Sequence, residues 1–168
     1  MRFHYCPDCG HKLELRPIGD EGEVPFCPVC SRPRFDMFST CAIVLVVNEE
    51  EEALLLNQNY ISNQYCTLVS GYMKPGETAE ETARREVLEE TGVELDELEI
   101  VGTYWYAPGD MLMPGFFARA KKSALKPSCE VDAARWIPVQ QAITMVHPKE
   151  QHSVAYLLLE EYINRKRS

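Results

Sequence analysis

Residues 71–93 read GYMKPGETAEETARREVLEETGV and carry the strongest structural signal in the chain. A loop rich in glycine and proline comes first. A helix is then expected from Thr78 to Thr91, ended by Gly92 as its C-cap. Small apolar residues recur at helical spacing and form a narrow stripe along this helix: Ala79, Ala83 and Val87. A narrow stripe lets a helix lie close to a sheet, so we expect a packed helix beside a cleft.

Three glutamates of the predicted helix, Glu86, Glu89 and Glu90, lie at positions i, i+3 and i+4 and therefore share one face. Like charges this close repel one another unless cations offset them. Clusters of carboxylate oxygens suit Mg²⁺ or Mn²⁺. Taken alone, the three glutamates are equally compatible with an ordinary acidic helix surface.

The formal net charge of −9 over 168 residues argues against a broad basic surface for nucleic acid. It would also repel a phosphate-bearing substrate, a conflict that bound divalent cations resolve. The longest apolar run, Cys41–Val47, is far shorter than the roughly 20 residues that cross a bilayer. The N-terminus lacks the apolar region of a signal peptide, so no membrane partner and a cytoplasmic location are expected.

Residues 37–168 alternate predicted strands and helices and are expected to form one α/β domain. Six strands are expected, several with β-branched or alternating apolar residues: Cys41–Val47, Ala53–Asn57, Tyr65–Ser70, Leu98–Ala107, Met111–Ala120 and Glu130–Pro138. A closing amphipathic helix is expected over His152–Arg165. It carries apolar residues at helical spacing: Val154, Ala155, Leu158, Leu159 and Tyr162.

Residues 1–36 differ in kind, with five prolines, two CxxC pairs and too few apolar residues for a core. The four cysteines are Cys6, Cys9, Cys27 and Cys30. Two such knuckles complete the tetrahedral sulfur shell of a structural zinc ion, with no open coordination position. A disulfide pair is the alternative, but seven cysteines and no export signal fit it poorly. A redox CxxC would need a βαβ context. We therefore predict a zinc ribbon over residues 1–36.

The helix segment resembles the Nudix box, GX5EX7REUXEEXGU, at all nine defined positions: Gly71, Glu77, Arg85, Glu86, Val87, Glu89, Glu90, Gly92 and Val93. The resemblance implies an α/β/α sandwich with a mixed sheet. It also implies metal-dependent hydrolysis of a nucleoside diphosphate linked to another group.

Residue by residue, the resemblance implies that Mg²⁺ or Mn²⁺ is bound by three glutamates and one backbone carbonyl: Glu86, Glu89, Glu90 and Ser70. Glu77 and Arg85 would support the box through a salt bridge and by orienting a glutamate. Catalysis would depend on Arg85 and on a carboxylate that takes a proton from water, either Glu86 or Glu89. The sequence leaves that choice open.

A zinc ribbon followed by the box is similar to the NADH pyrophosphatase branch of the superfamily. In that branch a metal-binding glutamate lies six residues before a strand-ending tryptophan, as Glu130 does before Trp136. An acid at the start of a strand is the alternative for Glu130. The branch's SQPWPFPxS motif is replaced here by residues 104–114, YWYAPGDMLMP. Tyr104, Tyr106 and Met111 are the expected substrate contacts of this segment, although aromatic residues on a strand also pack in cores.

The leading hypothesis is therefore a nucleotide diphosphatase acting on NADH, NAD, ADP-ribose, FAD or a similar dinucleotide. A second hypothesis is a regulatory or nucleic-acid-binding protein with a Nudix fold that uses the ribbon for contact. The intact set of box glutamates favours catalysis over this second hypothesis, because a protein that only binds does not need them. A narrower third hypothesis is removal of a dinucleotide cap from RNA. The sequence excludes neither a monomer nor a homodimer.

Overall fold

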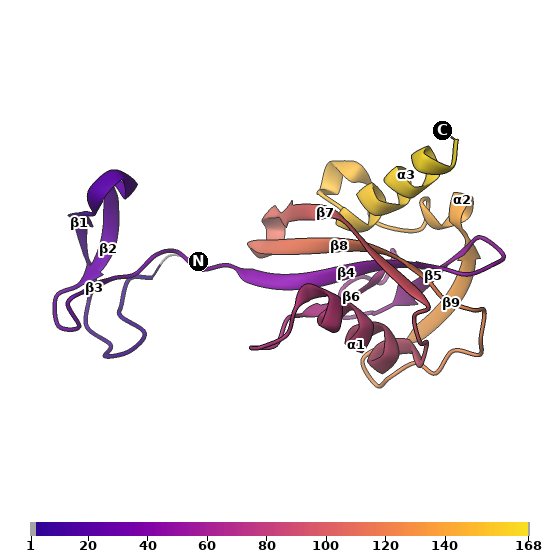
Figure 1. The fold of residues 1–168 in the computed structure, drawn as a ribbon, viewed down its shortest axis with the longest axis horizontal. Helices are drawn as coiled ribbons and strands as arrows, with labels where there is room; N and C mark the ends of the chain where they lie inside the picture. The colour runs from indigo at the N-terminus through magenta and orange to yellow at the C-terminus, as the bar shows by residue number, and fades with distance from the viewer. Residues whose placement is uncertain (1–2, 168) are drawn as a thin grey trace. The chain divides into compact units, whose positions relative to one another are not determined.

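The computed structural model describes residues 3–167, which group into two compact units, Met1–Phe38 and Ser39–Ser168 (Figure 1). No helix among residues 3–167 combines the length and apolar character needed to span a membrane. Each unit has a sheet of its own. The two are described separately below.

The first unit is a three-stranded antiparallel sheet in the order β1-β2-β3. Its elements are β1 Glu14–Pro17, the 3₁₀ turn η1 Gly19–Glu21, β2 Glu23–Cys27 and β3 Arg32–Pro33. Within residues 3–38 the buried apolar side chains are Cys6, Val24 and Cys27. So small a core cannot offset the entropy lost on folding, so a cross-link such as a metal ion is needed.

The second unit has a six-stranded mixed sheet with β4 at its centre. Its path is β7-β8-β4-β5-β9, and β6 pairs with β4. β4 and β8 run parallel, whereas the other pairs are antiparallel. The strands are β4 Ser39–Val47, β5 Glu52–Asn57, β6 Val69–Tyr72, β7 Glu97–Tyr106, β8 Met111–Arg119 and β9 Ala133–Pro138. The turn between β7 and β8 is η2 Ala107–Gly109. The predicted α/β class with a mixed sheet is confirmed.

The continuous apolar run of β4 is explained by helices on both faces of the sheet. Odd-numbered residues from Cys41 to Val47 pack toward α3 Val154–Arg167 and α2 Val139–Ala142. Even-numbered residues, Ala42, Val44 and Val46, pack toward α1 Ala79–Thr91. Figure 1 shows α1 on one side of this sheet and α3 on the other. The five apolar residues predicted to anchor the closing helix are all buried.

α1 begins and ends where its sequence predicts. The side chain of Thr78 accepts a hydrogen bond from the Glu81 amide, and the Glu81 carboxylate accepts one from the Thr78 amide. This capping box satisfies two amides of the first turn. Gly92 ends the helix with φ 72°, a left-handed conformation that glycine adopts without a steric penalty. Ala83 and Val87 are fully buried against the sheet, so one helix face is fixed and the glutamate face is fixed with it.

Two predicted strand boundaries are wrong. The third strand was expected over Tyr65–Ser70, but β6 covers Val69–Tyr72 and so extends into the box. Residues 66 and 67 form only isolated bridges. The strand expected over Glu130–Pro138 begins only at Ala133. Ser128 accepts hydrogen bonds from the amides of Glu130 and Val131, so this stretch is a turn and Glu130 lies within it.

Candidate active site and cysteine cluster

Arg85 organises the carboxylates of the box. It binds Glu77 through two hydrogen bonds, Nε to Oε1 at 2.7 Å and Nη2 to Oε2 at 2.8 Å. Its Nη1 reaches Glu86 Oε1 at 2.6 Å and Glu89 Oε2 at 3.1 Å, while Nη2 also donates to the Tyr72 carbonyl. Hydrogen bonds from Arg85 lower the pKa of Glu77 to about 2. The planar guanidinium therefore ties the loop before α1 to two glutamates of the helix.

The box glycine permits the close approach of Glu86 to β6. A Cβ atom at Gly71 would lie 2.0 Å from the Glu86 carboxyl carbon. No side chain larger than hydrogen therefore fits at Gly71 while Glu86 keeps this position. Because Gly71 pairs with Ala42 of β4, the Glu86 carboxylate lies directly beside the centre of the sheet.

Glu90 is a buried carboxylate with incomplete pairing. Only 5% of the residue is exposed, and Gln58 Nε2 donates to its Oε1 at 3.1 Å. Its Oε2 is buried and has no hydrogen-bond partner among residues 3–167. Burial, with the nearby charges of Glu86 and Glu130, raises the pKa of Glu90 to about 7. An orphaned oxygen of this kind is costly unless a cation binds it.

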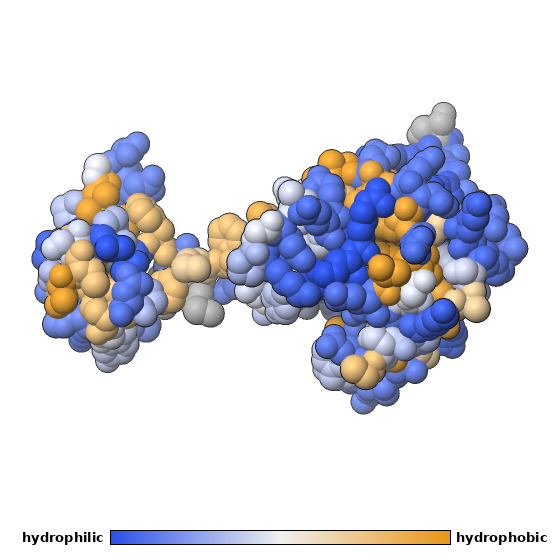
Figure 2. Space-filling view, turned by 60° about the horizontal axis from the view of Figure 1, so that its bottom comes forward, coloured by the Kyte–Doolittle hydropathy of each residue, from blue (hydrophilic) through white to orange (hydrophobic). Residues whose placement is uncertain are grey.

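A cavity of about 860 Å³ brings these groups together. Its lining includes four of the predicted metal-binding residues: Ser70, Glu86, Glu90 and Glu130. Glu89 is not among the lining residues. The Glu89 side chain is 54% exposed and faces Arg85 and, at 3.9 Å, Lys74. On the face shown in Figure 2, residues 39–167 are mostly hydrophilic, and hydrophobic residues gather in one hollowed area.

These groups suit a divalent cation chemically, because carboxylate and carbonyl oxygens are hard ligands and one buried oxygen lacks a partner. Their oxygens do not converge on one point. Among residues 3–167, only the four cysteines form a group of three or more His, Cys, Asp or Glu ligand atoms within 4.8 Å of one another. Arg85 holds Glu86 and Glu89, while Gln58 holds Glu90.

The three expected substrate contacts separate in the structure. Tyr106 and Met111 line the cavity, on either side of the β7–β8 turn. Tyr104 is absent from the lining and packs against the core between the sheet and α3. A Cβ atom at Gly115 would meet the Tyr104 ring at 2.6 Å, so this ring covers the glycine. That position does not favour substrate contact by Tyr104.

Several cavity residues were missed by the sequence analysis. They come from the segment after β5 and from the segment before α3, and include Gln58, Tyr60, Tyr65, His147 and Gln151. Gln58, which is 3% exposed, follows the last residue of a predicted strand. The only sequence signal for Gln58 is that it forms, with Asn57, a pair of polar residues at the end of that predicted strand. Tyr65 begins a predicted strand, but nothing in that strand pattern indicates a cavity, and Tyr60, His147 and Gln151 lie outside the predicted strands and helices.

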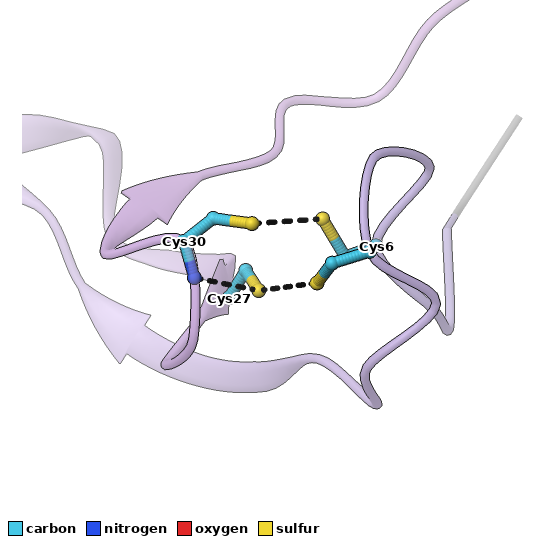
Figure 3. A group of neighbouring side chains, drawn as sticks. Cys6, Cys27 and Cys30 are labelled. Carbon is cyan, nitrogen blue, oxygen red and sulfur yellow. Dashed lines mark hydrogen bonds between the residues drawn. The ribbon is translucent and has the colours of Figure 1, made fainter.

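The four cysteines of the first unit meet as predicted. Cys6 and Cys30 have their Sγ atoms 3.9 Å apart, and those of Cys9 and Cys27 are 3.6 Å apart (Figure 3). Four sulfurs at Zn–S distances of about 2.3 Å would be separated by about 3.8 Å in a tetrahedron. All seven cysteines of the chain are free thiols. The Nη2 of Arg34 lies 3.3 Å from Cys6 Sγ, where its positive charge favours the thiolate. The cluster is consistent with a small zinc ribbon.

A mixed sheet between helices, with the box on α1 and its glycine beside Glu86, defines the Nudix fold and motif. The family model for the NUDIX domain matches residues 37–159, so the chain belongs to the Nudix family, a family of hydrolases.

Two bacterial relatives of this chain are each about 30% identical to it in sequence. The NAD-capped RNA hydrolase NudC of Stutzerimonas stutzeri is 30% identical over 98% of this chain and 58% of that protein. The protein of the same name from Pseudomonas aeruginosa is 29% identical, over 96% of this chain and 56% of its own length. The chain thus spans a little over half the length of these relatives. A Nudix hydrolase from Nitrosomonas europaea shares the fold, with a TM-score of 0.70 and 23% identity over 95% of this chain and 92% of that one.

Proposed function

We propose that the chain hydrolyses the diphosphate linkage of a nucleoside diphosphate derivative such as NADH, NAD, ADP-ribose or FAD, using Mg²⁺ or Mn²⁺. The observation that carries this proposal is the orphaned oxygen of buried Glu90 in a cavity shared with Glu86 and Glu130. Burying a carboxylate with an unpaired oxygen, close to two further carboxylates, is unfavourable for a protein that only folds. It is useful where a cation and a diphosphate bind in the same place.

Glu86, Glu90, Glu130 and the Ser70 carbonyl would hold the metal ion. Bound there, it would offset the negative charge of the diphosphate and lower the pKa of a water molecule. Gln58 orients Glu90 through the hydrogen bond to Oε1, and Oε2 has no hydrogen-bond partner among residues 3–167. Arg85 holds Glu86 and connects it to Glu77. These contacts hold the carboxylates around the cavity, and a bound cation would draw their oxygens together.

Of the two candidates for the proton acceptor, we favour Glu86. Glu86 lines the cavity and has a side chain only 14% exposed, whereas Glu89 is half exposed outside the lining. A general base must lie within hydrogen-bond reach of the proton that it removes. Hydrolysis forms one bond from water oxygen to phosphorus and breaks the bridging P–O bond. From a dinucleotide, two phosphate monoesters leave.

The test is turnover of NADH, NAD, ADP-ribose and FAD with Mg²⁺ or Mn²⁺, followed by chromatography of the products. AMP is the expected common product, and none should form once the divalent ion is omitted. If none of the four compounds is cleaved under either metal condition, the proposal is wrong. The hypothesis of a Nudix-fold regulatory or nucleic-acid-binding protein would then take its place.

We also propose that Cys6, Cys9, Cys27 and Cys30 hold one structural zinc ion per chain. The sulfur separations of 3.6 and 3.9 Å support it, because they match the edges of a zinc tetrahedron. Four thiolates leave no position for a substrate, so this ion would take no part in hydrolysis. The cytoplasmic location fits reduced cysteines and stays a prediction. A homodimer stays a possibility beside a monomer.

Removal of a dinucleotide cap from RNA is a second candidate function. It is favoured by the similarity to the NAD-capped RNA hydrolases of Pseudomonas aeruginosa and Stutzerimonas stutzeri. The net charge of −9 argues against tight binding of the RNA chain. This candidate is tested by comparing two rates: cleavage of the cap diphosphate in a short NAD-capped RNA, and cleavage of the diphosphate in free NAD. Faster cleavage of the capped RNA would favour it.

A further inference from the structure

One wall of the cavity contains polar and aromatic groups that the hydrolytic chemistry does not use. This wall combines Tyr65 with His147 and Gln151, all of which line the cavity. The two segments that carry them are tied together, since the Cys66 amide donates to the Met145 carbonyl at 2.8 Å. The glutamates belong to α1 and to the turn at residue 130. The cavity lining thus combines carboxylates from α1 and residue 130 with aromatic and polar side chains from two other segments.

Within this wall, His147 contacts both of its partners directly. Its ring centroid lies 4.4 Å from that of Tyr65, with the rings inclined at 40°. Its Nδ1 lies 2.8 Å from Gln151 Oε1. An amide oxygen only accepts, so this contact requires the proton on Nδ1 and leaves Nε2 of a neutral imidazole as an acceptor. It also leaves the two N–H groups of the Gln151 amide as donors, with no other hydrogen bond among residues 3–167.

We propose that Tyr65, His147 and Gln151 form a subsite for a heteroaromatic ring of the substrate, with Gln151 reading the hydrogen-bonding edge of that ring. The inference rests on the proposed function, because it assigns the part of the cavity that the diphosphate does not fill. Flat aromatic side chains bind planar bases by stacking. Donors beside an acceptor suit the edges of adenine and of a carboxamide, which carry both kinds of group. A volume of about 860 Å³ leaves room for such a ring beside a diphosphate.

His147 acts in this subsite as a positioning residue for Gln151. Gln151 is exposed and ends the short turn η3 Lys149–Gln151, so its side chain would otherwise sample several rotamers. The hydrogen bond from His147 selects one of them. Loss of either partner should therefore have the same consequence for ring binding, and loss of both should add little more.

Calorimetric binding of three ligands, measured in Mg²⁺, tests the subsite without requiring turnover. AMP and nicotinamide mononucleotide carry a ring, whereas ribose 5-phosphate does not. Wild-type protein should bind at least one ring-bearing ligand more tightly than ribose 5-phosphate. Gln151→Ala should weaken that ligand roughly fivefold, as expected for one hydrogen bond, and leave ribose 5-phosphate unchanged. Tyr65→Leu should weaken it roughly tenfold by removing the stacked ring.

The matched control is Gln141→Ala, which removes an exposed glutamine of α2 outside the cavity lining and should leave all three affinities unchanged. His147→Phe keeps a ring against Tyr65 but removes the hydrogen bond, so it should weaken the ring-bearing ligand as much as Gln151→Ala does. The affinity of the double variant His147→Phe/Gln151→Ala for this ligand should be at most about twofold lower than that of either single variant. Equal losses for all three ligands, or no loss for any, would overturn the subsite. Failure of hydrolysis with these ring-specific losses intact would overturn only the proposed function.

Discussion

The four cysteine sulfurs of the first unit lie within 4.8 Å of one another. The oxygens of Glu86, Glu89 and Glu90 do not converge in this way, although the three residues are closer along the chain: Glu86 and Glu89 bind Arg85, and Glu90 binds Gln58. Glu86 lies beside Gly71, Glu89 faces solvent, and Glu90 is buried beside Gln58. The sulfur separations of 3.6 and 3.9 Å suit thiolates whose charge one shared cation would offset. Between Glu86 and Glu89 the Arg85 guanidinium offsets the repulsion instead, and Glu90 is held by the Gln58 amide.

This difference separates a site that completes a fold from one that receives a ligand. In the proposed zinc site every cysteine ligand would bind one ion, and that ion would supplement the small core of residues 3–38. The glutamate site keeps its ligands spread around a cavity of about 860 Å³, which leaves space for a diphosphate. The predictions below test this contrast, beginning with the largest expected effect.

Cys27→Ser should abolish the cysteine site. Structural zinc contributes roughly 10–16 kcal/mol in small domains, so residues 3–38 should lose their fold while residues 39–167 keep theirs. Metal analysis should find about one zinc per chain in wild type and almost none in the variant. Hydrogen exchange resolved by segment would show the loss of protection. Cys129→Ser, at an exposed cysteine, is the control. A disulfide among the four cysteines in freshly isolated protein would contradict the prediction.

Glu90→Gln should lower kcat/KM at least about a hundredfold, roughly 2.7 kcal/mol of transition-state binding, because it removes a buried metal-binding charge. Glu89 shares the helical face but is half exposed, so Glu89→Gln should cost less. Glu130→Gln should also cause a milder loss than Glu90→Gln. Glu80→Gln, an exposed glutamate of the same helix, serves as the control. Equal losses of kcat/KM in Glu89→Gln and Glu90→Gln would contradict the prediction that the buried glutamate contributes more than the exposed one.

Without added divalent ions, stability should fall as pH rises from about 4.5 to 7. The pKa of Glu90 is raised to about 7 in the folded protein, so the folded state binds more protons in this window than the unfolded state. The loss should be on the order of 3 kcal/mol and should vanish in Glu90→Gln. The pKa of Glu77 is lowered to about 2, so its contribution is lost only at lower pH. Thermal unfolding of both proteins between pH 4.5 and 8 measures this, and parallel curves would contradict it.

The smallest expected effect concerns substrate choice. NADH should be preferred over ADP-ribose or FAD by less than about a hundredfold, roughly 2.7 kcal/mol. The segment from Tyr104 to Pro114 lacks the SQPWPFPxS motif, and Met111 at the cavity adapts its shape to different rings. The measurement is kcat/KM for NADH, NAD, ADP-ribose and FAD under one metal condition. A stronger preference for NADH would show that the motif is dispensable.

Patterns local in the chain were sufficient for much of the molecule. The run Cys41–Val47 predicted a buried strand, and its alternate residues pack on opposite sides of the sheet. The spacing of Ala83 and Val87 predicted which face of α1 meets the sheet. The CxxC spacing predicted the convergence of four sulfurs. In each case the side-chain direction follows from the strand or helix period, or from a tight turn.

The sequence by itself therefore determined the Nudix fold, the glutamate helix and the cysteine cluster. Only the tertiary structure decided that Glu90 is buried against Gln58, that Glu89 lies outside the cavity lining, and that Tyr65 meets His147. Glu89 and Glu90 are adjacent in the sequence, and each lies about one helical turn after Glu86. Glu90 also follows buried Val87 by three residues, so the helical period places it nearer the sheet than Glu89. The contact of Glu90 with Gln58, 32 positions away, and that of Tyr65 with His147, 82 positions apart, join segments distant in the sequence. No local period encodes such contacts, since they depend on how distant segments cross.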